Sequence, residues 1–282
     1  MDGFLFIDKP VGLTSHDVVA KIRRQFKLDK VGHTGTLDPF ASGLLILCLG
    51  KATKLAYLFS DLDKVYEGTL VFGSHYDTYD TTGKVVKKDY PTLSEEQIKH
   101  AMKSFLGTYE QLPPMYSALK VNGQKLYDIA RRGDEVDREK RQVDIHQFDL
   151  LAYDGQLHMD FYAHVSKGTY IRSLAVDLSE RLGTLGALSR LRRLQVGSYH
   201  ITQAKTMEHL TLDDVVTLET YFRNTPSIVL NDYMIKLVKN GVYLDERQIE
   251  TDQPFIVKNQ DGNMIAYYTV NDMYHYRPVI IF

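Results

Sequence analysis

Apolar and polar positions follow two different periods along the chain, so strands and helices occur together in it. Apolar side chains form continuous or alternating runs of strand length in residues 3–7, 44–49, 65–72 and 157–165. They recur at helical spacing, or fit a short helix, in residues 14–27, 51–58, 94–105, 171–182 and 211–222. The pattern contains no internal repeat and no low-complexity tract.

Capping residues mark where two of these helices begin. Thr14 with Asp17, and Ser94 with Gln97, have the spacing of a capping box, in which two side chains satisfy each other's backbone N–H groups. Gly107 follows the second helix and is placed to end it. These local signals predict helix boundaries independently of the rest of the fold.

The composition changes near residues 224–227, and the tail beyond has its own strand signals. Residues 255–257 and 264–268 are apolar runs separated by a turn that contains an Asp-Gly pair, which predicts a hairpin. Residues 278–282 can close a small sheet with it. We therefore expect two domains, residues 1–225 and a small β-rich domain of residues 226–282.

The stretch of residues 32–47 begins as a loop and ends as a strand. Its first dozen residues hold three glycines and a proline and show no helical period. Asp38 stands between Leu37 and Pro39, and the proline biases its backbone toward extended geometry. A lone carboxylate is thus held on a stiff, partly apolar loop, although an ordinary Asp-Pro turn has the same residues.

Composition narrows the class of protein. A chain of 282 residues, 44% hydrophobic and 25% charged, can bury a sizeable core, and no apolar run or N-terminal pattern suggests a membrane span or signal peptide. We therefore expect a cytoplasmic protein.

Cys48 lies in an apolar run and is expected to pack in the core. The ten histidines lack the paired spacing of a zinc or iron site, and the turn with Asp77 and Asp80 has too few oxygens for calcium, so we expect no metal.

Charge is segregated along the chain. The net charge of −2 does not point to a nucleic-acid partner. Residues 167–205, however, hold seven Lys or Arg and two acids, whereas residues 244–282 hold three basic and six acidic residues. A basic segment of this kind fits either a nucleic-acid surface or a solvated helix face.

Five blocks of the chain, in order, resemble the TruB family of pseudouridine synthases, which isomerise the uridine at position 55 in the T-loop of tRNA. They are DKPVGLTSH (8–16), GHTGTLDPFASGLL (32–45), KVYEG (64–68), QLPP with SALK (111–120) and SKGTYIR (166–172). The resemblance implies an α+β pseudouridine synthase fold, with a mixed central sheet flanked by helices and a small C-terminal domain of PUA-like, RNA-binding type.

The same resemblance implies roles for individual residues. Asp38 matches the catalytic aspartate and Arg172 the arginine that pairs with it. Tyr66 matches the tyrosine that stacks on the flipped uracil and is a candidate base for the C5 proton. His33 matches the histidine that takes the place of the flipped base. Two further residues, Tyr170 and Leu191, match the walls of the uracil pocket.

The resemblance also implies how RNA is held. The T-arm stem-loop of tRNA is the expected partner, and residues 121–143 are expected to form an insertion that grips it and orders on RNA. Candidate phosphate contacts are Lys9, Lys64, Lys120 and residues 190–193. We expect a monomer, and no cofactor, because the isomerisation requires neither redox chemistry nor a metal.

Two other functions remain compatible with parts of this pattern. A nucleosidase could use Asp38 as its nucleophile, but it would need a second carboxylate as proton donor, and the matched loops supply none. A non-catalytic RNA-binding or RNA-folding module would account for the basic segment. It would not account for Asp38, Tyr66 and Arg172 together.

Overall fold

The computed structural model describes residues 1–117, 119–121, 123–134 and 136–282. Ala118 of the fourth matched block lies outside the described residues, as do Asn122 and Glu135 of the expected insertion. The side chain of Lys120, an expected phosphate contact, also lies outside them.

Within the described part of the chain, a mixed sheet of ten strands forms the centre of the fold. Its order is β14 (Val216–Thr217), β1 (Gly3–Lys9), β3 (Ser42–Leu49), β12 (Gly186–Val196), β4 (Lys64–Phe72), β11 (His158–Val165), β10 (Arg141–Tyr153) and β7 (Gly107–Gln111). Two short strands join it at the side, β2 (Val31–His33) on β3 and β13 (Tyr199–His200) on β12. The β3–β12 pair is parallel and the other pairs are antiparallel.

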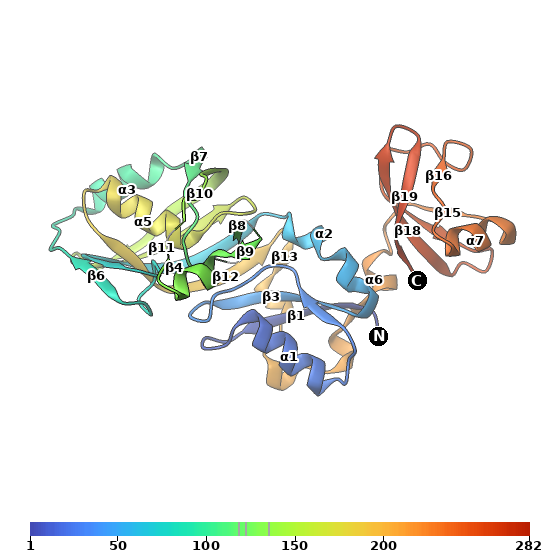
Figure 1. Cartoon of the computed structure of the whole chain (residues 1–282), viewed down its shortest axis with the longest axis horizontal. Coiled ribbons are helices and arrows are strands. Elements are labelled where there is room, and N and C mark those ends of the chain that lie inside the picture. Colours follow the sequence, from blue (N-terminus) through green and yellow to red (C-terminus); the bar gives the residue numbers. More distant parts are fainter. Residues whose placement is uncertain (118, 122, 135) are drawn as a thin grey trace.

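Strand alternation gives this sheet two faces. On β1, Leu5 and Ile7 point to one face, and Phe4 and Phe6 to the other. The first face packs against α1 (Ser15–Gln25), α3 (Glu95–Lys103) and α5 (Ile171–Arg181) in one continuous apolar core. Figure 1 shows α3 and α5 together at the end of the sheet formed by β10 and β11, and α1 beside β1.

Within the described residues, the second face is covered mainly over β1 and β3, and also at the end of β12 around Val196. There it packs against the 3₁₀ helix η1 (Gly50–Leu55), α2 (Tyr57–Ser60), α6 (Leu218–Tyr221) and the C-terminal sheet. Cys48 is fully buried in this cluster, where burial raises the pKa of its thiol to about 12, as suits a packing residue. Over β4, β10 and β11 most side chains of the second face are exposed or half-buried, although Val65 at the start of β4 is buried.

The C-terminal sheet has five strands among the described residues. Their order is β15 (Ser227–Val229), β17 (Phe255–Lys258), β18 (Met264–Asp272), β19 (His275–Ile281) and β16 (Leu244–Asp245), and α7 (Asp232–Lys239) packs against them. The expected hairpin is β17–β18 and the closing strand is β19. Ile256, Tyr267 and Ile280 belong to the same apolar cluster as Phe4 and Phe6 of β1. Figure 1 shows α6 where the C-terminal part meets the rest of the chain.

The remaining elements are short. They are the β5–β6 pair (Ser74–Tyr76, Val85–Lys88), the β8–β9 pair (Lys120–Val121, Gln124–Lys125), α4 (Leu126–Arg131), and the 3₁₀ helices η2 (Ile201–Gln203), η3 (Met207–His209) and η4 (Leu212–Asp214). The α+β class, with a mixed sheet and a small β-rich C-terminal part, is as expected.

Three local expectations are wrong. Residues 211–222 do not form one helix, because Val216 and Thr217 pair with the edge of β1, leaving η4 before them and α6 after them. Residues 51–58 form the 3₁₀ helix η1 followed by the single turn α2. Gly107 does not end α3, which stops at Lys103; with φ of 88° it instead begins β7.

Candidate active site

A cavity of about 290 Å³ opens on the helix-covered face of the central sheet. Its walls come from the loop between β2 and β3, from β4 and β12, and from the turn that leads into α5. Asp38, Tyr66, Tyr170, Arg172 and Leu191 all line it. Segments far apart in the sequence therefore converge on a space suited to a small ring.

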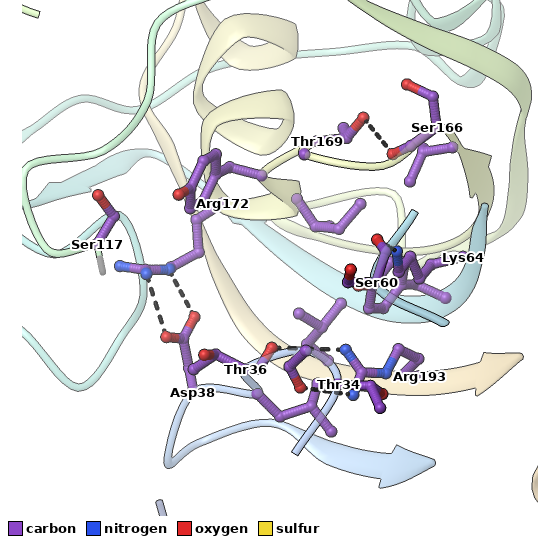
Figure 2. A pocket seen from close by; sticks show the side chains of 18 residues that line it. Thr34, Thr36, Asp38, Ser60, Lys64, Ser117, Ser166, Thr169, Arg172 and Arg193 are labelled. Carbon is purple, nitrogen blue, oxygen red and sulfur yellow. Dashed lines mark hydrogen bonds and ion pairs between the residues drawn. The ribbon is translucent and has the colours of Figure 1, made fainter. Parts of the chain in front are cut away.

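Asp38 and Arg172 form a two-point ion pair across this cavity (Figure 2). Arg172 Nε lies 2.9 Å from Asp38 Oδ2, and Nη2 donates to Oδ1 at 3.2 Å. The guanidinium is 5% exposed and the carboxylate 33% exposed, so the arginine forms the inner wall and the aspartate faces the opening. Such a bidentate pair fixes the orientation of the carboxylate as well as its charge.

Other polar groups hold the far side of the guanidinium. Arg172 donates to the backbone carbonyls of Thr78 (2.8 Å) and Tyr116 (2.7 Å). Its Nη1 also lies 3.8 Å from the carboxylate of Asp80, which is buried and does not line the cavity. The arginine therefore bridges two carboxylates, of which only Asp38 faces the space where a ligand would lie.

The electrostatics of Asp38 follow from this arrangement. Desolvation raises the pKa of the Asp38 carboxyl, the Arg172 guanidinium opposes this shift, and the Asp80 carboxylate adds to it. The ammonium of Lys9 is a further influence that lowers it. The net direction is upward, so Asp38 takes up a proton at a higher pH than an ordinary aspartate would.

The Asp38 loop is fixed at several points by the first matched block. The Ser15 hydroxyl, at the start of α1, accepts from Leu37 N (2.8 Å) and donates to Leu37 O (3.1 Å). The N–H of Gly12 donates to Pro39 O at 2.7 Å. Hydrogen bonds on both sides of Asp38 therefore set the position of its backbone.

Arg193 on β12 also holds the Asp38 loop in place. It is 2% exposed, and its guanidinium donates to Leu44 O at 2.7 Å and to Gly35 O at 3.1 Å. Gly43 packs against its backbone so closely that a Cβ would lie 2.2 Å from Arg193 O. This contact accounts for the glycine at the entry to β3.

Tyr66 on β4 and Leu191 on β12 provide apolar walls, and both are largely buried. Tyr170 is the N-cap residue of α5 and has no side-chain cap. The fully buried amide of Gln111 pairs instead with the backbone of Tyr170 itself, accepting from Tyr170 N (2.7 Å) and donating to Tyr170 O (3.1 Å). Gln111 therefore fixes the turn from which Tyr170 and Arg172 reach the cavity.

Two protein-family models match the chain. The model described as "TruB family pseudouridylate synthase (N terminal domain)" matches residues 23–171, and the one described as "tRNA pseudouridylate synthase B C-terminal domain" matches residues 172–235. The chain belongs to the TruB family.

Relatives match along the whole chain. The protein named tRNA pseudouridine synthase B in Onion yellows phytoplasma (strain OY-M) is 50% identical over 283 residues, covering 100% of both chains. Its namesake in Acholeplasma laidlawii (strain PG-8A) is 49% identical over 282 residues, also covering 100% of both. Among solved structures, a chain of a Cbf5-Nop10-Gar1 complex matches with a TM-score of 0.70 and 25% identity, covering 96% of this chain and 79% of that one.

Within this TruB-family chain, the expected site residues do not all lie together. Five of them line the cavity, whereas His33 lies at the end of β2 beside it and does not. Its ring packs edge-on against His16 at 5.2 Å. Desolvation, with the nearby charges of His16 and Arg193, lowers the pKa of His33 to about 4, so its imidazole is neutral near pH 7.

The expected phosphate contacts need correction. Lys9 is fully buried, its ammonium donates to the carbonyls of Pro10 and Leu13, and desolvation lowers its pKa to about 8. Arg193 is buried as well, so neither side chain presents a charge to RNA in this structure. Lys64 lines the cavity, but its ammonium also donates to two carbonyls. Arg190 is half-exposed and pairs with Asp160, and Arg192 is partly exposed and pairs with Asp8.

Sequence reasoning missed two residues that support the site. Asp80 was expected only to shape a turn, and nothing in its local sequence indicates that Arg172 lies 3.8 Å away. Gln111 stands in a matched block, yet its two hydrogen bonds to Tyr170 depend on a contact between distant segments. Its place in the matched block Gln111-Leu112-Pro113-Pro114 was the one signal that the sequence offered.

Proposed function

We propose that the chain isomerises uridine to pseudouridine in tRNA, at position 55 of the T-loop, with Asp38 as the reacting carboxylate. The observation that carries this proposal is the two-point Asp38–Arg172 pair in the wall of a small cavity. It occurs in a TruB-family chain whose relatives, between 38% and 50% identical, are named tRNA pseudouridine synthase B.

The reaction breaks the N1–C1′ bond of uridine, turns the uracil, and joins C5 to C1′. C5 loses a proton and N1 gains one, so substrate and product are isomers and no electrons need be supplied. Asp38 can attack C1′ or C6, or remove a sugar proton to form a glycal. Each route requires the ionised carboxylate, which Arg172 favours against desolvation.

The other cavity residues have roles that suit a detached base. Tyr66 offers a ring on which a flipped uracil can stack, and its hydroxyl is a candidate base for the C5 proton. Tyr170 and Leu191 close the sides, which keeps the uracil in place while it turns. The target base has to leave its stack, because a cavity of about 290 Å³ admits one nucleobase and not a helix.

Recognition of the T-arm would use surfaces around the cavity. The neutral imidazole of His33, beside the loop, is suited to take the place of the flipped base. Residues 121–143, which include α4, are the proposed RNA-gripping insertion. We assign residues 1–225 to the catalytic domain and 226–282 to a PUA-like domain. We further propose that the protein acts as a monomer.

The first experiment is incubation of the purified protein with a T-arm stem-loop RNA in chelator. Pseudouridine is then detected as a carbodiimide-dependent stop in reverse transcription. One new stop, at the loop uridine, is expected. Tight binding without a stop would favour the non-catalytic RNA-binding module instead.

A matched variant tests the role of Asp38. D38N keeps the size of the side chain but removes its charge, so RNA binding should remain while pseudouridine formation is abolished. Retained turnover would contradict the assigned role. Release of uracil from free uridine by the native protein would instead favour a nucleosidase.

A further inference from the structure

Two histidines and an aspartate from three separate segments meet on the uncovered face of the central sheet. Asp63 lies in the turn before β4, His146 on β10 and His164 on β11. Their potential ligand atoms all lie within 4.8 Å of one another. Asp63 Oδ2 is 3.2 Å from His146 Nε2 and 3.9 Å from His164 Nε2.

This cluster is separate from the cavity. Val165 lines the cavity, and since successive strand residues point to opposite faces, His164 points away from it. The ammonium of Lys64, the neighbour of Asp63, is occupied by the carbonyls of Ser60 and Leu62. Within the described residues, the two imidazoles are the only ion-pair partners of the Asp63 carboxylate.

The backbone around these residues directs their three side chains toward one another. His146 lies where the β10–β11 register shifts between Ile145 and Gln147, an irregularity of the kind that redirects side chains. The carbonyl of Asp63 accepts from Gly197 N at 2.8 Å, which fixes the turn that carries its carboxylate. The two imidazole rings lie 4.8 Å apart, centre to centre.

Two imidazole nitrogens and one carboxylate oxygen are a ligand set typical of zinc and similar ions. We propose that Asp63, His146 and His164 bind one divalent transition-metal ion of this class, with water completing its coordination. Tetrahedral ligands about 2.0–2.1 Å from Zn²⁺ lie roughly 3.3 Å apart, a separation that Asp63 and His146 already have. His164, whose Nε2 is 3.9 Å from Asp63 Oδ2, would reach the ion by a small side-chain rotation. Such a rotation is open to it because all three side chains are 38–45% exposed.

The pattern escaped sequence reasoning because the ligands lie far apart in the chain. Asp63 precedes His146 by 83 positions, and His164 follows His146 by 18. The antiparallel β10–β11 pairing brings the two histidines together, and β4, next to β11, brings in Asp63. Mg²⁺ and Ca²⁺ prefer all-oxygen ligand sets, so the site should discriminate against them.

The test is calorimetric titration of the metal-stripped, full-length, untagged protein with Zn²⁺, supported by the visible spectrum of Co²⁺. One Zn²⁺ per chain should bind, with affinity at least tenfold weaker in H146N and in H164N. Millimolar Mg²⁺ should not displace it. Co²⁺ should give the absorption bands of a four-coordinate site in the native protein and lose them in both variants.

His158 provides a matched control. It lies on the same strand as His164, is more exposed, and contacts a carboxylate, Asp154, at 2.9 Å, but no third ligand joins this pair in the described residues. H158N should bind Zn²⁺ as the native protein does. Equal weakening in H158N and H146N, undiminished binding in both H146N and H164N, or no binding by the native protein would each overturn the proposal. Pseudouridine formation in chelator, unchanged in H146N, would show that the variant is folded.

Discussion

Replacement of Arg172 by lysine tests whether the geometry of the arginine, and not only its charge, supports Asp38. Arg172 makes two contacts with Asp38 and donates to the carbonyls of Thr78 and Tyr116. A lysine ammonium has three donors on an unbranched stem and cannot reproduce the planar fork. R172K therefore keeps the positive charge but loses the two-point contact and at least one carbonyl partner.

The size of the effect follows from burial. Arg172 is 5% exposed, so carbonyls that lose their donor are left without water to replace it. Two lost hydrogen bonds from a charged donor suggest a decrease of about 3–6 kcal/mol in the free energy of unfolding. A displacement of the Asp38 carboxylate by about 1 Å would slow the reaction roughly 100-fold. Binding of RNA should change little, since Arg172 forms the inner wall and Asp38 faces the opening.

The assays are urea unfolding and single-turnover pseudouridine formation on saturating T-arm RNA. The matched control is R190K. Arg190 also pairs with an aspartate, Asp160, at 3.3 Å, but it is 50% exposed, so its replacement should change stability by less than about 1 kcal/mol. If R172K equalled R190K in both stability and rate, the two-point contact between Arg172 and Asp38 would contribute to neither.

Three further predictions concern the neighbours of this pair. Asp80 helps to raise the pKa of the Asp38 carboxyl, and the reaction rate falls as the pH drops through that pKa. D80N should therefore shift the acid limb of the single-turnover pH profile to lower pH. An unmoved limb would contradict the influence of Asp80 on Asp38. Q111L removes both hydrogen bonds to Tyr170 and should destabilise the protein by about 1–3 kcal/mol in urea unfolding, with a slower rate; native stability would mean that the α5 N-terminus is held by other contacts. L191A enlarges the cavity and should lower stability by about 2–4 kcal/mol, while D38N, of unchanged volume, should not show this loss.

Features of the fold that depend on short stretches of sequence were predictable. The capping boxes at Thr14 and Ser94 begin α1 and α3, because a cap depends only on residues within one turn. The helix expected over residues 211–222 failed for the opposite reason. Val216 and Thr217 pair with β1, more than 200 positions away in the sequence. The hydrogen bonds and packing of this strand pairing outweigh the local helical spacing of apolar residues.

The candidate site was predictable through resemblance, and only in part through chemistry. The sequence presents Asp38 as a carboxylate on a stiff loop, and matched blocks link it to Arg172, Tyr66, Tyr170 and Leu191, which do surround one cavity. Contacts that support them, such as those of Asp80 and Gln111, come from segments that only the tertiary fold brings near. No periodicity encodes such contacts.

The buried cations show most clearly what a single sequence leaves open. A lysine or arginine in an RNA-modifying chain is a reasonable phosphate contact, and the same residue can equally be a support for the loop; both interpretations need a cation at that position. Burial decides between them. Lys9 and Arg193 are enclosed, each donates to backbone carbonyls, and Arg193 bonds directly to the Asp38 loop at Gly35. Arg172 and Lys9 both lower the pKa of the Asp38 carboxyl, so these two cations counter the desolvation that the cavity imposes on it. The buried positive charges of Lys9 and Arg172 therefore act on the protein's own carboxylate, which is a role that a count of basic residues along the sequence does not reveal.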